Sequence, residues 1–279
     1  MTMTPGNYLE HAVEWFQQSV PFTGAKHQPL IDLWRGVYAD ALKAPRFLLP
    51  EGGVAVTTKL THLVTPVRLP YPCIVLEFTM GAHRLILIAR EMTDNNGKPH
   101  IAVYHVYVAK PPIGREHEGL YWVPNEVVTV IDLAHFDRKL DGSHAIRLIN
   151  MQTGQRVSIG SGADHVVKCL QENCGLSVLS LIQALQCCNV TTGAIPPSAA
   201  LNKKRIANNR LPFVEYKVLM LGDERSASTP QGGHHASPRQ HLRRGHIRRI
   251  SDNRTVWVNQ CLVGNPNKGF IVKDYRVKA

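Results

Sequence analysis

Three consecutive apolar runs decide the fold of this chain: Cys73-Ile-Val-Leu-Glu-Phe78, Arg84-Leu-Ile-Leu-Ile-Ala-Arg-Glu91 and His100-Ile-Ala-Val-Tyr-His-Val-Tyr-Val-Ala109. All three are rich in β-branched and aromatic residues, which is typical of strands buried in a sheet. The turn sequence Asp94-Asn-Asn-Gly97 separates the last two runs, as the loop of a hairpin would. No segment between the runs is long enough for a helical crossover, so we predict a mainly antiparallel sheet.

Further segments extend this pattern along the chain. Strands are expected within residues 54–64, 127–133, 147–159 and 214–221, whereas residues 189–197 have the composition of a loop. Apolar residues at helical spacing predict helices over residues 9–20, 30–41 and 164–185. The predicted fold class is therefore α+β, with N-terminal helices, a mainly antiparallel β body, a central helix and a small basic C-terminal β module.

The expected organisation has three parts. Residues 1–160 hold the helical pair and the β-rich domain, residues 161–200 form a helical connector, and residues 201–279 form a basic β-hairpin module. No apolar run approaches the roughly 18 residues that span a bilayer, and no export signal is visible. We therefore expect a soluble cytoplasmic protein without membrane contact.

The positive charge is concentrated in the C-terminal part. The first 202 residues contain 16 basic and 16 acidic residues, whereas the rest contain 16 basic and five acidic residues, so the whole formal net charge of +11 lies after Asn202. Its densest stretch is Arg239-Gln-His-Leu-Arg-Arg-Gly-His-Ile-Arg-Arg249. Such asymmetry points to a polyanionic partner, either nucleic acid or a complex that contains it.

A basic hairpin follows from this stretch. Strands on either side of the loop Ser251-Asp-Asn-Arg254 would pair Ile250 with Thr255 and Arg248 with Trp257. In that register one face carries Arg244, His246, Arg248, Trp257 and Asn259, and the other carries Ile247, Val256 and Val258. A slip of one residue would exchange the faces.

The polar face would offer guanidinium groups to phosphates and an indole for base stacking. The residues that we predict to contact nucleic acid are Lys203, Lys204, Arg205, Arg210, Arg239, His241, Arg243, Arg244, His246, Arg248, Arg249, Trp257, Asn259 and Lys273. A charged hairpin can also be simply a solvated face or a protein-binding face.

Several stretches of this region resemble an uncharacterised family of bacteriophage and prophage proteins. They are Leu201-Asn-Lys-Lys-Arg205, Leu211-Pro-Phe-Val-Glu-Tyr-Lys-Val-Leu219, Ser237-Pro-Arg-Gln-His-Leu-Arg-Arg-Gly-His-Ile-Arg248, Val256-Trp-Val258, Val263-Gly264, Lys268-Gly269 and Lys273-Asp-Tyr275, with Leu69-Pro-Tyr-Pro-Cys-Ile-Val-Leu-Glu-Phe78 as a weaker companion. The resemblance implies a phage-related setting in a bacterial host cell, with work on host nucleic acid, host defence or transcription. It implies no activity.

Two other functions stay open beside non-enzymatic nucleic-acid binding. A metal-independent endoribonuclease would use His246 with His241 or Tyr275 for proton transfer and nearby arginines to stabilise the phosphate. A protein–protein inhibitor of a host defence enzyme would dock the basic module on an acidic surface. Arginines beside the histidines disfavour a metal, and we expect no cofactor. Glu77, Glu91 and Asp132 match no metal-nuclease spacing and are expected to be edge or salt-bridge residues. The sequence leaves the oligomeric state open.

Overall fold

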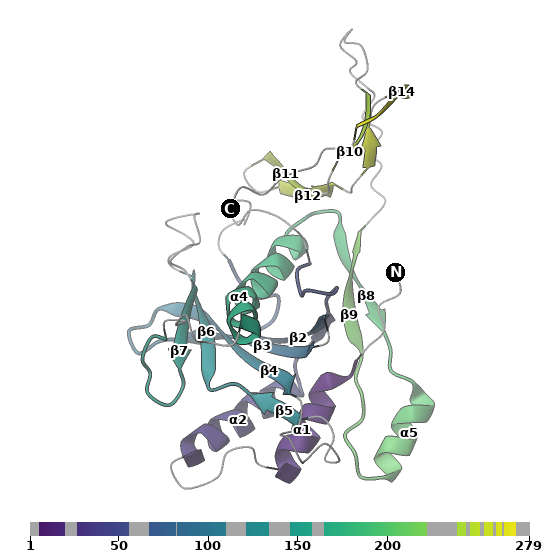
Figure 1. Ribbon diagram of the computed structural model, residues 1–279. Coiled ribbons are helices and arrows are strands. Elements are labelled where there is room, and N and C mark those ends of the chain that lie inside the picture. Colours follow the sequence, from purple (N-terminus) through teal and green to yellow (C-terminus); the bar gives the residue numbers. More distant parts are fainter. Residues whose placement is uncertain are drawn as a thin grey trace.

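A nine-stranded mixed sheet forms the centre of the molecule (Figure 1). The computed structural model describes residues 6–19, 27–55, 67–81, 83–109, 121–133, 146–157, 165–221, 239–243, 246–251, 254–258, 261–263 and 265–271. The strands of the sheet are β1 (Arg46–Leu48), β2 (Cys73–Met80), β3 (His83–Thr93), β4 (Pro99–Ala109), β5 (Tyr121–Pro124), β6 (Val127–Asp132), β7 (Ile146–Asn150), β8 (Val190–Ile195) and β9 (Tyr216–Leu221). The α+β fold class is thereby confirmed.

The sheet is antiparallel except around its short strand β1. Its order is β7-β6-β4-β3-β2-β1-β9-β8, with β5 paired to β4 beside β6. β1 runs parallel to both neighbours, placing Arg46 opposite Val75 of β2 and opposite Tyr216 of β9. The predicted hairpin between β3 and β4 is present, and the Asp94 carboxylate accepts the N–H groups of Asn96 and Lys98 at 2.8 Å in its loop.

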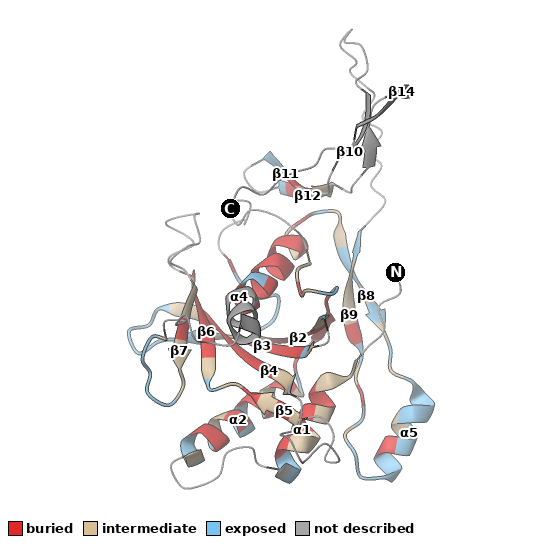
Figure 2. Cartoon of the chain, viewed as in Figure 1, coloured by how far each residue is buried: buried red, intermediate tan, exposed pale blue. Residues whose placement is uncertain are grey.

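Helices cover both faces of this sheet. The helix α4 (His165–Leu185) packs on one face against residues such as Leu76 and Leu87, and α1 (Tyr8–Ser19) and α2 (Gln28–Ala41) pack on the other against Val75 and Ile86. Strands buried on both faces need apolar side chains at successive positions, which explains the nearly continuous apolar runs of β2 and β3. Figure 2 shows these central strands and the inward helix faces as buried. No helix within the described ranges is both long and apolar enough to cross a membrane.

Several elements differ from the sequence-based expectation, among them the short strands β1 and β5, which we did not predict. Residues expected as a loop form β8, which pairs with β9 from Val190 opposite Leu221 to Ile195 opposite Tyr216. The helix α5 (Ala199–Ala207), which we did not predict, begins after Ser198, whose hydroxyl accepts the Leu201 N–H at 3.4 Å. The expected boundary at residue 200 therefore falls between β8 and β9 of a single sheet. Most of the strand expected over residues 54–64 lies outside the described residues.

The remaining strands form two small sheets. A hairpin consists of β11 (His246–Ser251) and β12 (Arg254–Val258), and a second sheet has the order β13 (Cys261–Val263), β10 (Arg239–Arg243), β14 (Asn265–Ile271). In Figure 1 the hairpin lies beyond the end of α4, at the top of the view, while α5 lies at the bottom. The cationic segments that follow Asn202 are therefore at opposite ends of the molecule.

Candidate functional sites

The basic hairpin, β11 with β12, is attached to the end of α4 by hydrogen bonds of β12. The Thr255 hydroxyl donates to the Gln186 carbonyl at 3.2 Å, and the Cys188 N–H donates to the Thr255 carbonyl at 2.9 Å. The Asn189 side-chain amide donates to the Trp257 carbonyl at 2.7 Å and accepts the Trp257 N–H at 2.8 Å. Backbone groups at and beyond a helix end lack hydrogen-bond partners within the helix, and the hairpin supplies such partners here.

One face of the hairpin is apolar and packs on the body. Ile247 is 3% exposed and forms a buried cluster with Ala184 and Cys187 at the end of α4. Trp257, directly opposite Ile247 in the hairpin, is partly buried against the same cluster. Burying this pair fixes which face of β11 is turned outward, because side chains alternate along a strand.

The expected register of the hairpin is wrong by one residue. Arg249, rather than Ile250, lies opposite Thr255, and Ser251 pairs with Arg254 after an irregularity in β11. The extra residue shifts the pairing, as a β-bulge does, and thereby turns Trp257 toward the body. Trp257 does not share a face with Arg248, so the predicted stacking platform beside the arginine is not formed.

The outward face of β11 nevertheless carries exposed positive charge. His246 and Arg248 alternate away from Ile247 and lie opposite Val258 and Val256. Arg248 on this face is exposed, and so is the next residue, Arg249, which alternation places on the face of Ile247 near the hairpin loop. Neither arginine forms an ion pair with any described residue. Their guanidinium groups are thus available to an anionic partner.

The other predicted contact residues are dispersed. The helix α5 contains Lys203, Lys204 and Arg205, and Arg210 follows it. The strand β10 contains Arg239, His241 and Arg243, whose side chains are outside the described part. The described residues do not include Arg244, Asn259, Lys273 and Tyr275. Arg205 is buried, which removes it from any nucleic-acid surface. The two histidines proposed for ribonuclease chemistry belong to different sheets, His241 to that of β10 and His246 to the hairpin.

A second site is formed where the end of α5 meets α1. Asn209 adopts a left-handed conformation (φ 51°) after the helix, and the N–H groups of Asn209 and Arg210 donate to the carbonyls of Ile206 and Arg205 at 3.0 and 2.9 Å. This Schellman arrangement satisfies the last carbonyls of α5 and reverses the chain sharply. The reversal brings the Arg210 side chain to α1.

Glu14 of α1 is the centre of this junction. Its Oε1 accepts Arg205 Nη2 at 2.7 Å and the Leu211 N–H at 2.9 Å, and its Oε2 accepts Arg210 Nη2 at 2.6 Å. Burial alone would raise the pKa of Glu14, but the hydrogen bonds from Arg210 and Leu211 and the charge of Arg205 hold it below its usual value. The guanidinium of Arg205 also lies 3.9 Å from the ring centroid of Phe213.

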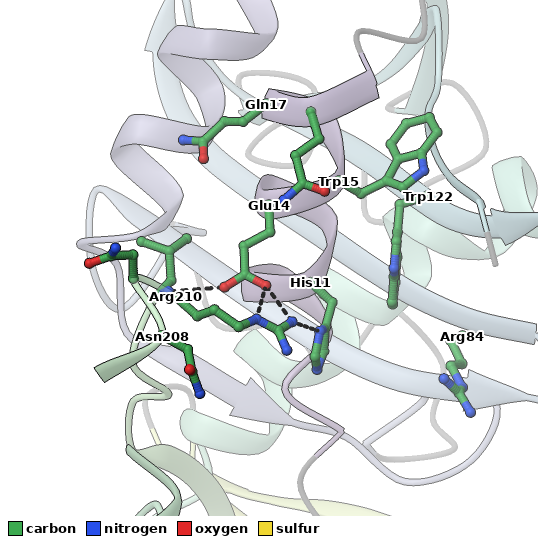
Figure 3. A pocket seen from close by; sticks show the side chains of 11 residues that line it. His11, Glu14, Trp15, Gln17, Arg84, Trp122, Asn208 and Arg210 are labelled. Atoms are coloured by element: carbon green, nitrogen blue, oxygen red, sulfur yellow. Dashed lines mark hydrogen bonds and ion pairs between the residues drawn. The ribbon is translucent and has the colours of Figure 1, made fainter. Parts of the chain in front are cut away.

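A cavity of about 730 Å³ opens beside this junction (Figure 3). We call it the cationic cleft and define it by its lining residues: His11, Glu14, Trp15, Gln17, Gln18, Arg84, Trp122 and residues 208–211. In Figure 3 the Glu14–Arg210 pair and His11 lie on one side, with Trp122 and Arg84 on the other. An adjoining hollow of about 440 Å³ shares His11, Asn208 and Arg210 and adds Lys204 and Arg205 to the cationic wall.

The environment of His11 disfavours the charged form of its imidazole. Burial and the charges of Arg205 and Arg210 lower its pKa. Its Nδ1 lies 3.4 Å from Arg210 Nη2, and because a guanidinium only donates, Nδ1 is the acceptor. The ring proton of the neutral imidazole is consequently on Nε2, which makes His11 a hydrogen-bond donor in the cleft wall.

A buried polar network binds the N-terminal end of α1. The Glu77 carboxylate of β2 accepts the N–H groups of Tyr8 and Leu9 at 2.9 and 3.0 Å and the Tyr216 hydroxyl at 2.5 Å. A carboxylate at a helix N-terminus complements the unsatisfied N–H groups and the helix dipole. Burial raises the pKa of Glu77, although the Tyr216 hydrogen bond acts in the opposite direction.

A buried ion pair lies in the same layer. Arg46 of β1 donates to Glu10 of α1, and both side chains are fully buried. The other two carboxylates considered for metal chemistry have ion-pair partners, since Glu91 lies 3.8 Å from Arg68 and Asp132 lies 3.5 Å from Arg147. This agrees with the expectation for Glu91 and Asp132, whereas Glu77 caps α1 instead.

The sequence contained one overlooked signal for the cleft. His11, Glu14, Trp15 and Gln18 recur at intervals of three and four residues, so they form a polar and aromatic stripe on α1 beside its apolar stripe. Arg84 and Trp122 gave no such signal, because only the sheet brings them to this stripe. Searches against protein-family models, curated proteins and solved structures found no match to this chain.

Proposed function

We propose that the protein binds nucleic acid through the exposed arginines of the basic hairpin, without catalysing a reaction on it. The observation that carries this proposal is the exposure of the neighbouring residues Arg248 and Arg249 on a strand that Ile247 anchors against the end of α4. Guanidinium groups bind phosphate oxygens with two parallel hydrogen bonds, and a fixed strand pre-orients them.

The distribution of charge supports the same proposal. All of the net charge of +11 lies after Asn202, and the hairpin is part of that segment. The hairpin carries part of this positive charge on exposed side chains, and a local excess of positive charge attracts a polyanion. In the phage-related setting that the motifs imply, the target is nucleic acid in the cytoplasm of a bacterial host.

The test is the salt dependence of binding to duplex DNA and to single-stranded RNA, measured by fluorescence anisotropy. Each phosphate contact contributes roughly 0.9 to the slope of log affinity against log salt for duplex DNA, and roughly 0.7 for single strands. The double variant Arg248→Ala/Arg249→Ala should therefore flatten the slope by about 2 on duplex DNA. Affinity itself should fall most at low salt.

The matched control is Arg35→Ala/Arg68→Ala, which removes two exposed arginines from the body and leaves the same net charge as the hairpin variant. It should keep the slope of the unaltered protein. The proposal fails if binding is absent, if it does not depend on salt, or if the two double variants change the slope equally.

A further inference from the structure

We propose that the cationic cleft is a binding site for a nucleoside phosphate. The proposal is independent of the hairpin, because the cleft is built from α1, β3, β5 and the residues after α5, at the other end of the molecule. It rests on three properties of the described lining residues: their charge, their aromatic surface and their hydrogen-bonding groups.

The charge of the cleft favours an anion. Its wall contains Arg84 and Arg210 against the single carboxylate of Glu14, and Arg205 lies directly behind Glu14. Both oxygens of Glu14 are already hydrogen-bonded to the arginines and to a backbone N–H, which screens the carboxylate from a ligand. Two arginines against one carboxylate leave the local balance positive.

Arg84 is the cation that an anionic ligand can reach. It is exposed and forms no ion pair with a carboxylate of the described chain. Its guanidinium carbon lies 5.7 Å from the ring centroid of Tyr8, and Tyr8 in turn contacts Trp122 with ring centroids 5.7 Å apart. The aromatic contact orients the guanidinium without neutralising it.

The aromatic surface favours a flat ring. Trp15 and Trp122 both line the cleft, but Trp122 is buried and only Trp15 is partly exposed. Trp15 is held by an edge contact with Tyr121 at 5.6 Å between ring centroids. An indole held in this way offers stacking or edge contacts to any of the nucleobases.

Hydrogen-bonding groups and size complete the match. The amides of Gln17, Gln18, Asn208 and Asn209 and the Nε2–H of His11 supply donors and acceptors for a base edge or a ribose. A volume of about 730 Å³ lies within the usual range for sites of small organic ligands. A cationic, tryptophan-lined and amide-rich cleft of this size fits a ring that carries a phosphate better than it fits either part alone.

The nucleotide has two sources, a free mononucleotide or the terminal nucleotide of a strand. Isothermal titration calorimetry of the full chain with AMP, GMP, CMP and UMP tests the first source. A 5′-phosphorylated trinucleotide tests the second. Adenosine and inorganic phosphate, titrated in parallel, measure what the ring and the anion contribute separately. We expect a nucleotide to bind more tightly than both, and the tighter of the two nucleotide forms identifies the source.

Two variants localise the binding. Arg84→Gln should lower nucleotide affinity about tenfold by removing the phosphate contact, and Trp15→Leu should lower it by a similar factor by removing a ring contact. Arg35→Gln is the matched control for Arg84→Gln, since it is an exposed arginine outside the cleft that should leave affinity unchanged. Thermal melting of each variant checks that the fold is retained.

The proposal is overturned if no nucleotide binds, if inorganic phosphate binds as tightly as every nucleotide, or if Arg84→Gln and Arg35→Gln behave alike in a folded protein. Failure here is distinct from failure of the hairpin. The variant Arg248→Ala/Arg249→Ala should retain mononucleotide binding, and Arg84→Gln should retain the salt slope for long strands.

Discussion

The Glu14 junction beside the cationic cleft and the basic hairpin use arginine in opposite ways. At the junction, Arg205 and Arg210 bind Glu14, a residue almost 200 positions earlier in the chain. In the hairpin, Arg248 and Arg249 lie on a strand that pairs with its immediate neighbour in sequence and are exposed. The difference shows that a cluster of basic residues in a sequence does not define one surface: burial and carboxylate partners decide which arginines build structure and which remain for a ligand.

The largest effect on stability is expected from removing the Glu14 carboxylate. The variant Glu14→Ala leaves the buried guanidinium of Arg205 without its counter-charge, which should lower the free energy of unfolding by about 4 kcal/mol. Urea denaturation measures this. The exposed pair Asp32–Arg35 provides the control, since Asp32→Ala should cost less than about 1 kcal/mol. Equal losses in the two variants would show that the junction is not a buried ion-pair site.

Acid should weaken the side of the body that carries the cleft. Burial lowers the pKa of His105 in β4 to about 4, and β4 pairs with β5, the strand of Trp122. The unfolded chain binds a proton near pH 6.5. Stability from neutral His105 is therefore complete above about pH 6.5 and lost as the pH falls toward 4, by about 3 kcal/mol.

The variant His105→Gln isolates this contribution, because glutamine does not titrate. The loss of unfolding free energy between pH 6.5 and 4 should be smaller in the variant than in the unaltered protein by the same amount, about 3 kcal/mol. Parallel pH profiles of the two proteins would refute a buried, neutral His105.

The hairpin should be separable from the body. Ile247→Ala removes most of the side chain that packs on Ala184 and Cys187, at a cost of about 2 kcal/mol to hairpin docking. Amide hydrogen exchange should speed up in β11 and β12 while the strands β2 to β4 keep their protection. Ile250→Ala, on the same strand but 53% exposed, is the matched control and should change neither. Faster exchange throughout the sheet would mean that hairpin and body unfold as one unit.

The smallest effect is expected on nucleotide affinity, in a comparison of two neighbouring lysines of α5. Lys204 lines the hollow that adjoins the cationic cleft, whereas Lys203 does not, and both are exposed. Lys204→Ala should weaken nucleotide binding by roughly two- to threefold through its screened charge, and Lys203→Ala should not. Calorimetric titration of the two variants would contradict a local effect if the affinities fell equally.

The central strands of the body were predictable because burial on both faces leaves an uninterrupted apolar signal in β2, β3 and β4. The register of the hairpin was not, since an irregularity at Ile250 moves the pairing by one residue and leaves no mark in composition. The strand β8 was also missed: its Thr-Thr-Gly-Ala sequence is half exposed, and only pairing with β9 makes it a strand.

The cleft could not be derived from the sequence as a whole. Its wall combines α1, Arg84 of β3, Trp122 of β5 and the turn after α5, which are distant in sequence and meet only in the folded sheet. Hydrogen bonds also join other segments that are far apart in sequence. Glu77 of β2 accepts the hydroxyl hydrogen bond of Tyr216 from β9, and Arg205 of α5 binds Glu14 of α1.

The position of β1 also has a consequence for the order in which the protein is made. β1 lies between β2 and β9, and the ribosome adds Tyr216 of β9 about 140 residues after Glu77 of β2. Before β9 is made, one side of β1 is an unpaired edge, and Glu77 lacks the hydrogen bond that the Tyr216 hydroxyl donates to it. The nascent N-terminal half is therefore expected to stay open to other strands, and to chaperones, until the segment 216–221 emerges and closes the sheet.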